Sequence, residues 1–160
     1  MAEPVWPAKR DFVRPTVMPI ACPVAASLGV LGRKWALPIL RDVAFYEDVR
    51  FSDILRMNPG LTPRVLSHRL RDLREADLVR RMPGARPREF TYELTAKGED
   101  TIPILTAFMD FAFRHLACDV FADGRARTVG KVLPGAQKEL LGHLMDYVEQ
   151  GKGGKRRGVR

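Results

Sequence analysis

The sequence predicts one mainly α-helical domain with a small β-hairpin. Apolar residues recur at intervals of three and four in successive segments between residues 23 and 116, which is the period of helices that bury one face. By contrast, Phe90, Tyr92 and Leu94 alternate with polar residues, as in a half-buried strand. The 160 residues are 46% hydrophobic and 29% charged, which suits a single globular core.

The first two helices are short. We expect one at 24–31, with Pro23 at its first helical position and Gly32 at its end. A second is expected at about 34–45, where Trp35, Ile39, Leu40 and Val43 recur at helical spacing. Pro38 requires this second helix to begin close before it or to kink there.

The best-specified helix follows a turn. Phe51, Ile54 and Leu55 predict a short helix that ends at the triplet Asn58-Pro59-Gly60, a strong turn signal. In the next helix Thr62 is suited to cap the N-terminus, and Pro63 is suited to the first position. Its inward stripe consists of Leu66, Leu70 and Leu73, and its opposite face carries Arg64, Ser67, His68 and Arg71.

A hairpin and a long helix complete the predicted domain. The strands are expected at 78–82 and 89–94, and the loop between them contains Arg86 and Arg88. Thr95 then caps a long helix that Pro103 should bend early. Its apolar stripe steps by 3, 4, 3 and 4 through Ile102, Leu105, Met109, Ala112 and Leu116, a spacing typical of packing against another helix.

The chain divides into four predicted parts. Residues 1–20 are interrupted by prolines and predict a flexible arm, residues 21–118 form the domain, and residues 119–150 form an extension with a helix near 136–149. Residues 151–160 form a basic tail with five positive charges and no negative one. This tail supplies +5 of the net charge of +8, so total charge alone does not identify nucleic acid as the partner.

Composition and motifs argue against several classes of protein. Two cysteines are too few for a disulfide scaffold, the proline-rich N-terminus lacks a signal-peptide pattern, and no stretch approaches the roughly 18 apolar residues of a membrane span. We therefore expect a cytoplasmic protein without membrane contact. The three histidines lie far apart, and the sequence contains no metal-binding spacing, phosphate-binding loop or nucleophile elbow, so neither an enzyme nor a metal or other cofactor is expected.

The order of the elements is the layout of a winged helix-turn-helix. A helix fits the major groove of DNA when one face anchors it to the body and the other reaches the base edges. Arginine can donate two hydrogen bonds to guanine, and serine or histidine can contact bases or phosphates. We therefore expect DNA contacts from Thr62 and the helix face after it, and phosphate or minor-groove contacts from Arg86 and Arg88.

Six ordered tracts extend this interpretation. They are Cys22-Pro23-Val24, Gly32-Arg33-Lys34-Trp35, Arg50-Phe51-Ser52, Pro59-Gly60-Leu61-Thr62, Leu66-Ser67-His68-Arg69-Leu70 and Tyr92-Glu93-Leu94-Thr95-Ala96-Lys97-Gly98. In this order, from about Cys22 to Leu116, the chain resembles the HxlR-type family of bacterial regulators. The stretch Pro87-Arg88-Glu89-Phe90-Thr91-Tyr92 departs from the family's usual wing, and residues after about Asp119 extend past its core.

The resemblance implies a homodimer that binds a palindromic operator in double-stranded DNA. In such a dimer the first and last core helices form the contact, with Val24, Leu28, Leu31, Leu105, Met109, Ala112 and Leu116 as the expected residues. Many family members sense electrophiles or oxidants through a cysteine just before the first helix, where this chain has Cys22. A helix N-terminus favours the reactive thiolate, although a free cysteine is also a common buried apolar residue. Cys118 is a weaker redox candidate.

Two alternatives remain open from the sequence. A winged helix can serve as an adaptor for another protein, and a regulator can respond to a non-covalent small ligand instead of thiol chemistry. A DNA reader should show steep salt dependence and should lose specificity when Arg64 or Arg71 is replaced by alanine, whereas an adaptor should not.

Overall fold

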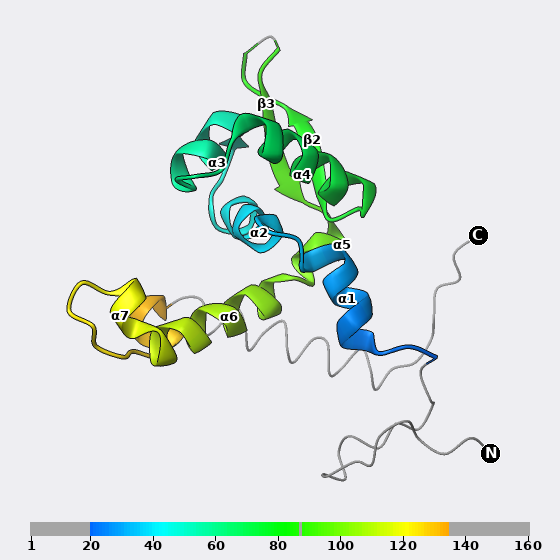
Figure 1. Cartoon of the computed structure of the whole chain (residues 1–160). Coiled ribbons are helices and arrows are strands. Elements are labelled where there is room, and N and C mark those ends of the chain that lie inside the picture. Colours follow the sequence, from blue (N-terminus) through cyan, green and yellow to red (C-terminus); the bar gives the residue numbers. More distant parts are fainter. Residues whose placement is uncertain (1–19, 87, 135–160) are drawn as a thin grey trace.

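The computed structural model describes residues 20–86 and 88–134, and within these ranges helices pack beside a small sheet (Figure 1). The elements in chain order are α1 (Pro23–Leu31), α2 (Ala36–Phe45), β1 (Val49–Arg50), α3 (Phe51–Met57), α4 (Pro63–Glu75), β2 (Val79–Pro83), β3 (Phe90–Leu94), α5 (Ala96–Glu99), α6 (Ile102–His115), α7 (Ala117–Val120) and α8 (Val129–Val132). This confirms the predicted mainly helical class. The expected arm, the helix near 136–149 and the basic tail lie outside the described residues, apart from residue 20 of the arm.

The sheet has one strand more than the predicted hairpin. Its three antiparallel strands lie in the order β1-β3-β2, and Val49 of β1 pairs with Tyr92 of β3. The added strand β1 lies in a stretch for which the sequence predicted no regular element. A strand of two residues is too short to show an alternation of apolar and polar side chains in the sequence. Its Val49 is buried and belongs to the core.

The predicted long helix is divided into two. Thr95 caps only α5, where its hydroxyl oxygen accepts the Gly98 N–H at 3.0 Å. The chain then leaves helical pairing around Asp100, and α6 begins at Ile102 with Pro103 in its first turn. Because the first N–H groups of a helix have no partner within it, Pro103 is compatible with a new helix start, so the expected bend is a break.

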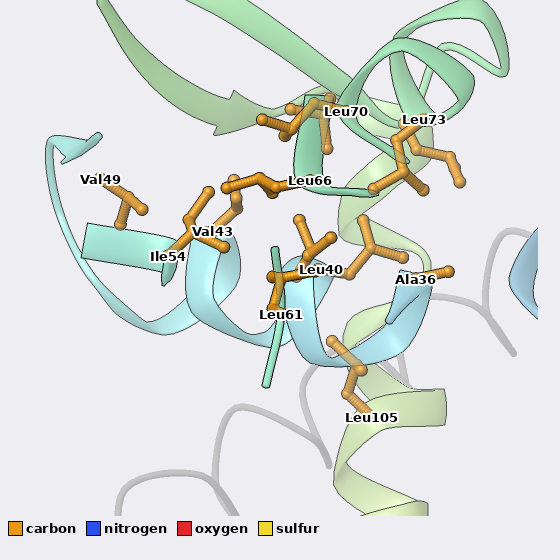
Figure 2. Packing of buried hydrophobic residues seen from close by; sticks show 13 residues of the cluster. Ala36, Leu40, Val43, Val49, Ile54, Leu61, Leu66, Leu70, Leu73 and Leu105 are labelled. Carbon is orange, nitrogen blue, oxygen red and sulfur yellow. The ribbon is translucent and has the colours of Figure 1, made fainter. Parts of the chain in front are cut away.

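The core lies between α2 and α4. Figure 2 shows Leu66, Leu70 and Leu73 of α4 packed toward Leu40 of α2, and all four side chains are buried. Leu105 of α6 joins the same cluster. Burying a leucine contributes about 2 kcal/mol, so the three leucines hold α4 firmly against the body.

Gly98 sits where α5 meets the loop after α4. A Cβ atom at this position would lie 2.0 Å from the Leu78 carbonyl oxygen. Lys97 Nζ donates to the Ala76 carbonyl oxygen at 2.7 Å, and Thr95 Oγ1 donates to that of Asp77 at 2.6 Å. The tract Thr95–Gly98 therefore ties α5 to the end of α4.

The contact at Gly98 gives the first testable prediction. Gly98→Ala is expected to lower the free energy of unfolding by about 3 kcal/mol, because the backbone carbonyl of Leu78 cannot move away as a flexible side chain could. Chemical denaturation measures the loss. Gly29→Ala is the matched control, since its Cβ would meet nothing within 4 Å, and equal stability losses in the two variants would contradict this account.

The chain after α6 folds back onto that helix. The Asp110 carboxylate accepts the Val129 N–H at 3.0 Å, and this hydrogen bond, together with Arg114 nearby, lowers the pKa of Asp110. Hydrogen bonds from Arg127 lower the pKa of Asp123 to about 2. The Asp110 hydrogen bond holds α8 beside α6, and the contact between Asp123 and Arg127 closes the loop that precedes α8.

Candidate nucleic-acid interface

The outer face of α4 presents the side chains that the sequence singled out. Arg64, Ser67, His68 and Arg71 are all exposed, while the leucines of the same helix are buried. Arg71 Nη2 lies 3.2 Å from His68 Nδ1. When Arg71 donates this hydrogen bond, His68 Nε2 carries the ring proton and can donate outward. The face therefore offers several donors of hydrogen bonds to a surface rich in acceptors.

The turn before α4 fixes where this face begins. Gly60 has a φ of 90°, a conformation that a residue with a side chain rarely adopts. Thr62 then caps α4, and its Oγ1 accepts the Val65 N–H at 3.3 Å. The cap and the start of the helix agree with the sequence prediction, and they place Arg64 in the first turn.

A buried polar network, which the sequence did not predict, supports this turn. Asp42 of α2 is fully buried, and its carboxylate accepts hydrogen bonds from the Asn58 side-chain amide and from Arg41 Nε, the latter at 2.9 Å. Asn58 also donates to the Ile54 carbonyl oxygen at 2.8 Å. These contacts join the end of α3 to α2, so they help to set the angle at which α4 leaves the turn.

The signal for this network was present in the sequence. Asp42 lies three residues after Ile39, on the apolar side of its helix, where an unpaired carboxylate would be costly to bury. Its partner could not be identified, because Asn58 is equally explained by the turn it begins.

The wing, formed by β2, β3 and their connecting loop, projects beyond α4 (Figure 1). Arg86 and Arg88 near its tip are exposed, and neither forms an ion pair with a described residue. The tip is closed by the Gly84 N–H, which donates to the Glu89 carbonyl oxygen at 2.8 Å. Arg50 pairs with Glu89 at 2.7 Å and so links the wing to β1.

Two other arginines of the wing are engaged within the chain. Arg80 pairs with Glu93 at 2.9 Å, and the Arg81 guanidinium lies 3.3 Å from the centre of the Phe90 ring. These contacts leave Arg86 and Arg88 as the wing residues best placed for a phosphate backbone.

The residues expected at a dimer contact differ widely in their exposure. In α1 no residue is buried, and Val24 and Leu28 are 66% and 55% exposed. Leu105, in contrast, is 4% exposed and belongs to the core of its own chain. Met109 and Ala112 are half-buried and Leu116 is exposed, while Leu31 is half-buried and packs against the core.

The most exposed apolar face of α6 was not predicted from the sequence. Phe108 and Phe111 are 58% and 55% exposed, and Ile104 lies one turn before Phe108. Apolar residues of α6 fall on two faces of the helix, and the sequence does not show which of them is buried. The packing of the helix shows that the face with Leu105 meets the core. Figure 1 shows α6 extending away from the body formed by α2, α3, α4 and the sheet.

Both cysteines are exposed. Cys22 directly precedes α1 and makes no side-chain hydrogen bond that caps the helix, and Cys118 lies in α7.

Within residues 20–86 and 88–134 no group of three histidine, cysteine or acidic side chains could hold a metal ion. None of the helices in these ranges has the length and apolarity needed to pass through a lipid bilayer.

Solved structures of transcription regulators resemble this chain. PA1607, described as a candidate transcription factor, is 30% identical, with a TM-score of 0.56 over 68% of this chain and 72% of its own. The redox regulator HypR, solved in reduced and oxidised forms, is 27% and 29% identical. Both comparisons give a TM-score of 0.53 over 57% of this chain, and they cover 90% and 94% of the HypR chains.

A candidate MarR-family regulator from Porphyromonas gingivalis W83 shares the fold. Its TM-score is 0.56 at 24% identity, over 63% of this chain and 99% of its own. A search of curated proteins finds no match. The family model described as HxlR-like helix-turn-helix matches residues 30–119, which is more than half of the chain. The chain therefore belongs to the HxlR-like helix-turn-helix family and is a transcriptional regulator of the helix-turn-helix type.

Proposed function

We propose that this regulator binds an inverted repeat in double-stranded DNA as a homodimer and that Cys22 controls its release. The observation that carries the DNA-binding part is the outer face of α4, where basic and polar side chains are exposed directly opposite leucines buried in the core. A rigid helix with this division matches the needs of major-groove recognition.

In this mechanism α4 enters the major groove and the wing contacts the backbone. Arg64 and Arg71 donate to guanine O6 and N7, while Ser67, His68 and Thr62 contact bases or nearby phosphates. Arg86 and Arg88 lie near the wing tip and contribute salt-dependent attraction to phosphate or the minor groove.

Dimerisation is supported by the apolar faces of α1 and α6. Val24 and Leu28 leave large apolar side chains exposed on α1, and Phe108 and Phe111 do so on α6; an exposed apolar helix face of this kind suits a contact with another protein. A two-fold dimer would place its α4 helices in successive major grooves, about 34 Å apart.

Charge on this surface should prevent the dimer. We expect Phe108→Glu/Phe111→Glu to shift the protein to a monomer, because two carboxylates would be desolvated at the contact. Analytical ultracentrifugation measures the change. Tyr46→Glu is the control, since Tyr46 is 58% exposed but lies at the end of α2. A double variant that remains dimeric would refute this interface.

Thiol control is supported by the exposure of Cys22 beside α1 and by the likeness to a protein described as a redox regulator. The Cys22 sulfur adds to a ring carbon of a quinone, so that a carbon–sulfur bond forms while the S–H bond and a ring C=C π bond break. The thiol proton passes to one ring oxygen and the hydrogen of the attacked carbon to the other, which leaves a hydroquinone thioether without any further oxidant or reductant. The added group would crowd α1 and disturb the dimer contact.

Cys22→Ser should abolish this response. We expect a quinone to release the wild-type protein from its operator and to leave the Cys22→Ser variant bound, as measured by fluorescence anisotropy. Cys118→Ser is the matched control and should respond like wild type. Equal release of the Cys22→Ser variant would eliminate sensing by Cys22.

The proposed function is tested by selecting bound duplexes from a random pool, with and without quinone treatment of the protein. We expect an inverted repeat to be enriched by the untreated protein and not by the treated one. Affinity for the enriched duplex should fall steeply with salt. If no sequence is enriched, and if the affinity for random DNA depends only weakly on salt, an adaptor that binds protein would be favoured.

A further inference from the structure

The structure gives α4 a third face, which is turned neither to the core nor to the proposed DNA side. Arg69, Asp72 and Ala76 follow one another at intervals of three and four, and they line a cavity of about 180 Å³. Gly29 and Val30 of α1 line its other side. This face therefore connects α4 with α1.

An ion triad lies beside this cavity. Arg69 Nη1 donates to Asp72 Oδ2 at 2.7 Å, and Arg33 Nη1, from the connection after α1, donates to the same oxygen at 3.2 Å. The Asp72 and Arg69 side chains are only 28% and 16% exposed. Asp72 is thus the carboxylate that joins α4 to the connection immediately after α1.

The attachment of α1 makes this triad important. Because α1 buries no residue of its own, few contacts fix its position relative to the body. The cavity leaves space between α1 and α4, and Arg69 Nε is buried without a partner among the described residues. A displacement of α1 would accordingly move Arg33 relative to Asp72 before it disturbed the leucines of the core.

We propose that Asp72 is the positioning residue that couples α1 to α4. This inference rests on the proposed function, in which α1 belongs to the dimer contact and α4 reads DNA. The shared carboxylate sets the position of α1 relative to the outer face of α4 and hence the relative angle of the two α4 helices in the dimer.

The test uses Asp72→Asn in the full chain, because this change keeps the shape and removes the charge. Losing a negative charge would by itself strengthen binding to DNA. We expect the opposite for the selected operator, a loss of about five-fold in affinity, with no loss for random DNA. Asp119→Asn in α7 is the matched control, because Asp119 is exposed and lies away from both α1 and α4, and it should not weaken operator binding.

A double-mutant cycle identifies the partner. Arg33→Ala/Asp72→Asn should bind the operator no more weakly than Asp72→Asn alone, because both changes break the same contact. Asp72→Glu should restore part of the operator affinity. Additive losses, or equal effects of Asp72→Asn and Asp119→Asn, would overturn the proposal.

Hydrogen exchange provides a measurement without DNA. In Asp72→Asn the amides of Ala26–Leu31 should exchange about five-fold faster, while those around Leu70 should be unchanged. Unchanged exchange in α1 would overturn the coupling. If the wild-type protein selects no operator, the proposed function fails, whereas this measurement still decides whether Asp72 holds α1.

Discussion

Arg64→Ala is expected to weaken binding to the selected operator by about 10- to 100-fold. A bidentate arginine–guanine contact is worth about 1–3 kcal/mol, and Arg64 lies exposed in the first turn of α4 with no ion pair to a described residue. Arg71→Ala should act in the same direction. Fluorescence anisotropy with the selected duplex and with random DNA measures both affinity and specificity.

The control for this prediction is Arg125→Ala. Arg125 is also exposed, but it lies after α7. Its replacement by alanine therefore removes the same charge from a site away from α4. Its effect should be small and equal for the two duplexes. If Arg64→Ala lowered affinity equally for operator and random DNA, Arg64 would be a phosphate contact and not a base contact.

Asn58→Ala is expected to lower the free energy of unfolding by about 3 kcal/mol. The change removes the amide that donates to Asp42, so a fully buried carboxylate keeps only part of its hydrogen bonds. The same variant should weaken operator binding, because the end of α3 is no longer tied to α2. Urea unfolding gives the stability, and anisotropy gives the affinity.

The matched experiment combines this change with Asp42→Asn. Once the buried charge is removed, loss of the Asn58 amide should cost less, and the two changes should not be additive. Ser52→Ala on the exposed side of α3 is the control and should have little effect. Additive losses at Asp42 and Asn58 would contradict an energetic coupling between them.

Local sequence signals predicted much of the fold. Pro23, Thr62 and Pro63 mark helix starts through their own backbone and side-chain chemistry, and each begins or caps a helix as expected. The leucine stripe of α4 is equally local, since its spacing alone separates the buried face from the outer one. These signals were sufficient to place the outer face of α4.

The remaining features depend on contacts between distant parts of the chain. The strand β1 exists because Val49 pairs with Tyr92, and Asp42 is tolerated because Asn58 reaches it from the end of α3. The assignment of Leu105 to the core, with Phe108 left exposed, follows from how α6 packs. The spacing of apolar residues shows which of them share a helix face. It does not show whether that face packs against the core of its own chain or stays exposed.

Methylation protection of guanine N7 in the selected operator shows directly whether α4 lies in the major groove. N7 lies in the major groove, so the account predicts protection of guanines in both half-sites, about one helical turn apart. In Arg64→Ala, protection should disappear at the one guanine per half-site that this residue contacts. Protection at adenine N3 in the minor groove with every guanine N7 left unprotected, or a pattern unchanged by Arg64→Ala and Arg71→Ala, would contradict the claim that α4 reads the DNA.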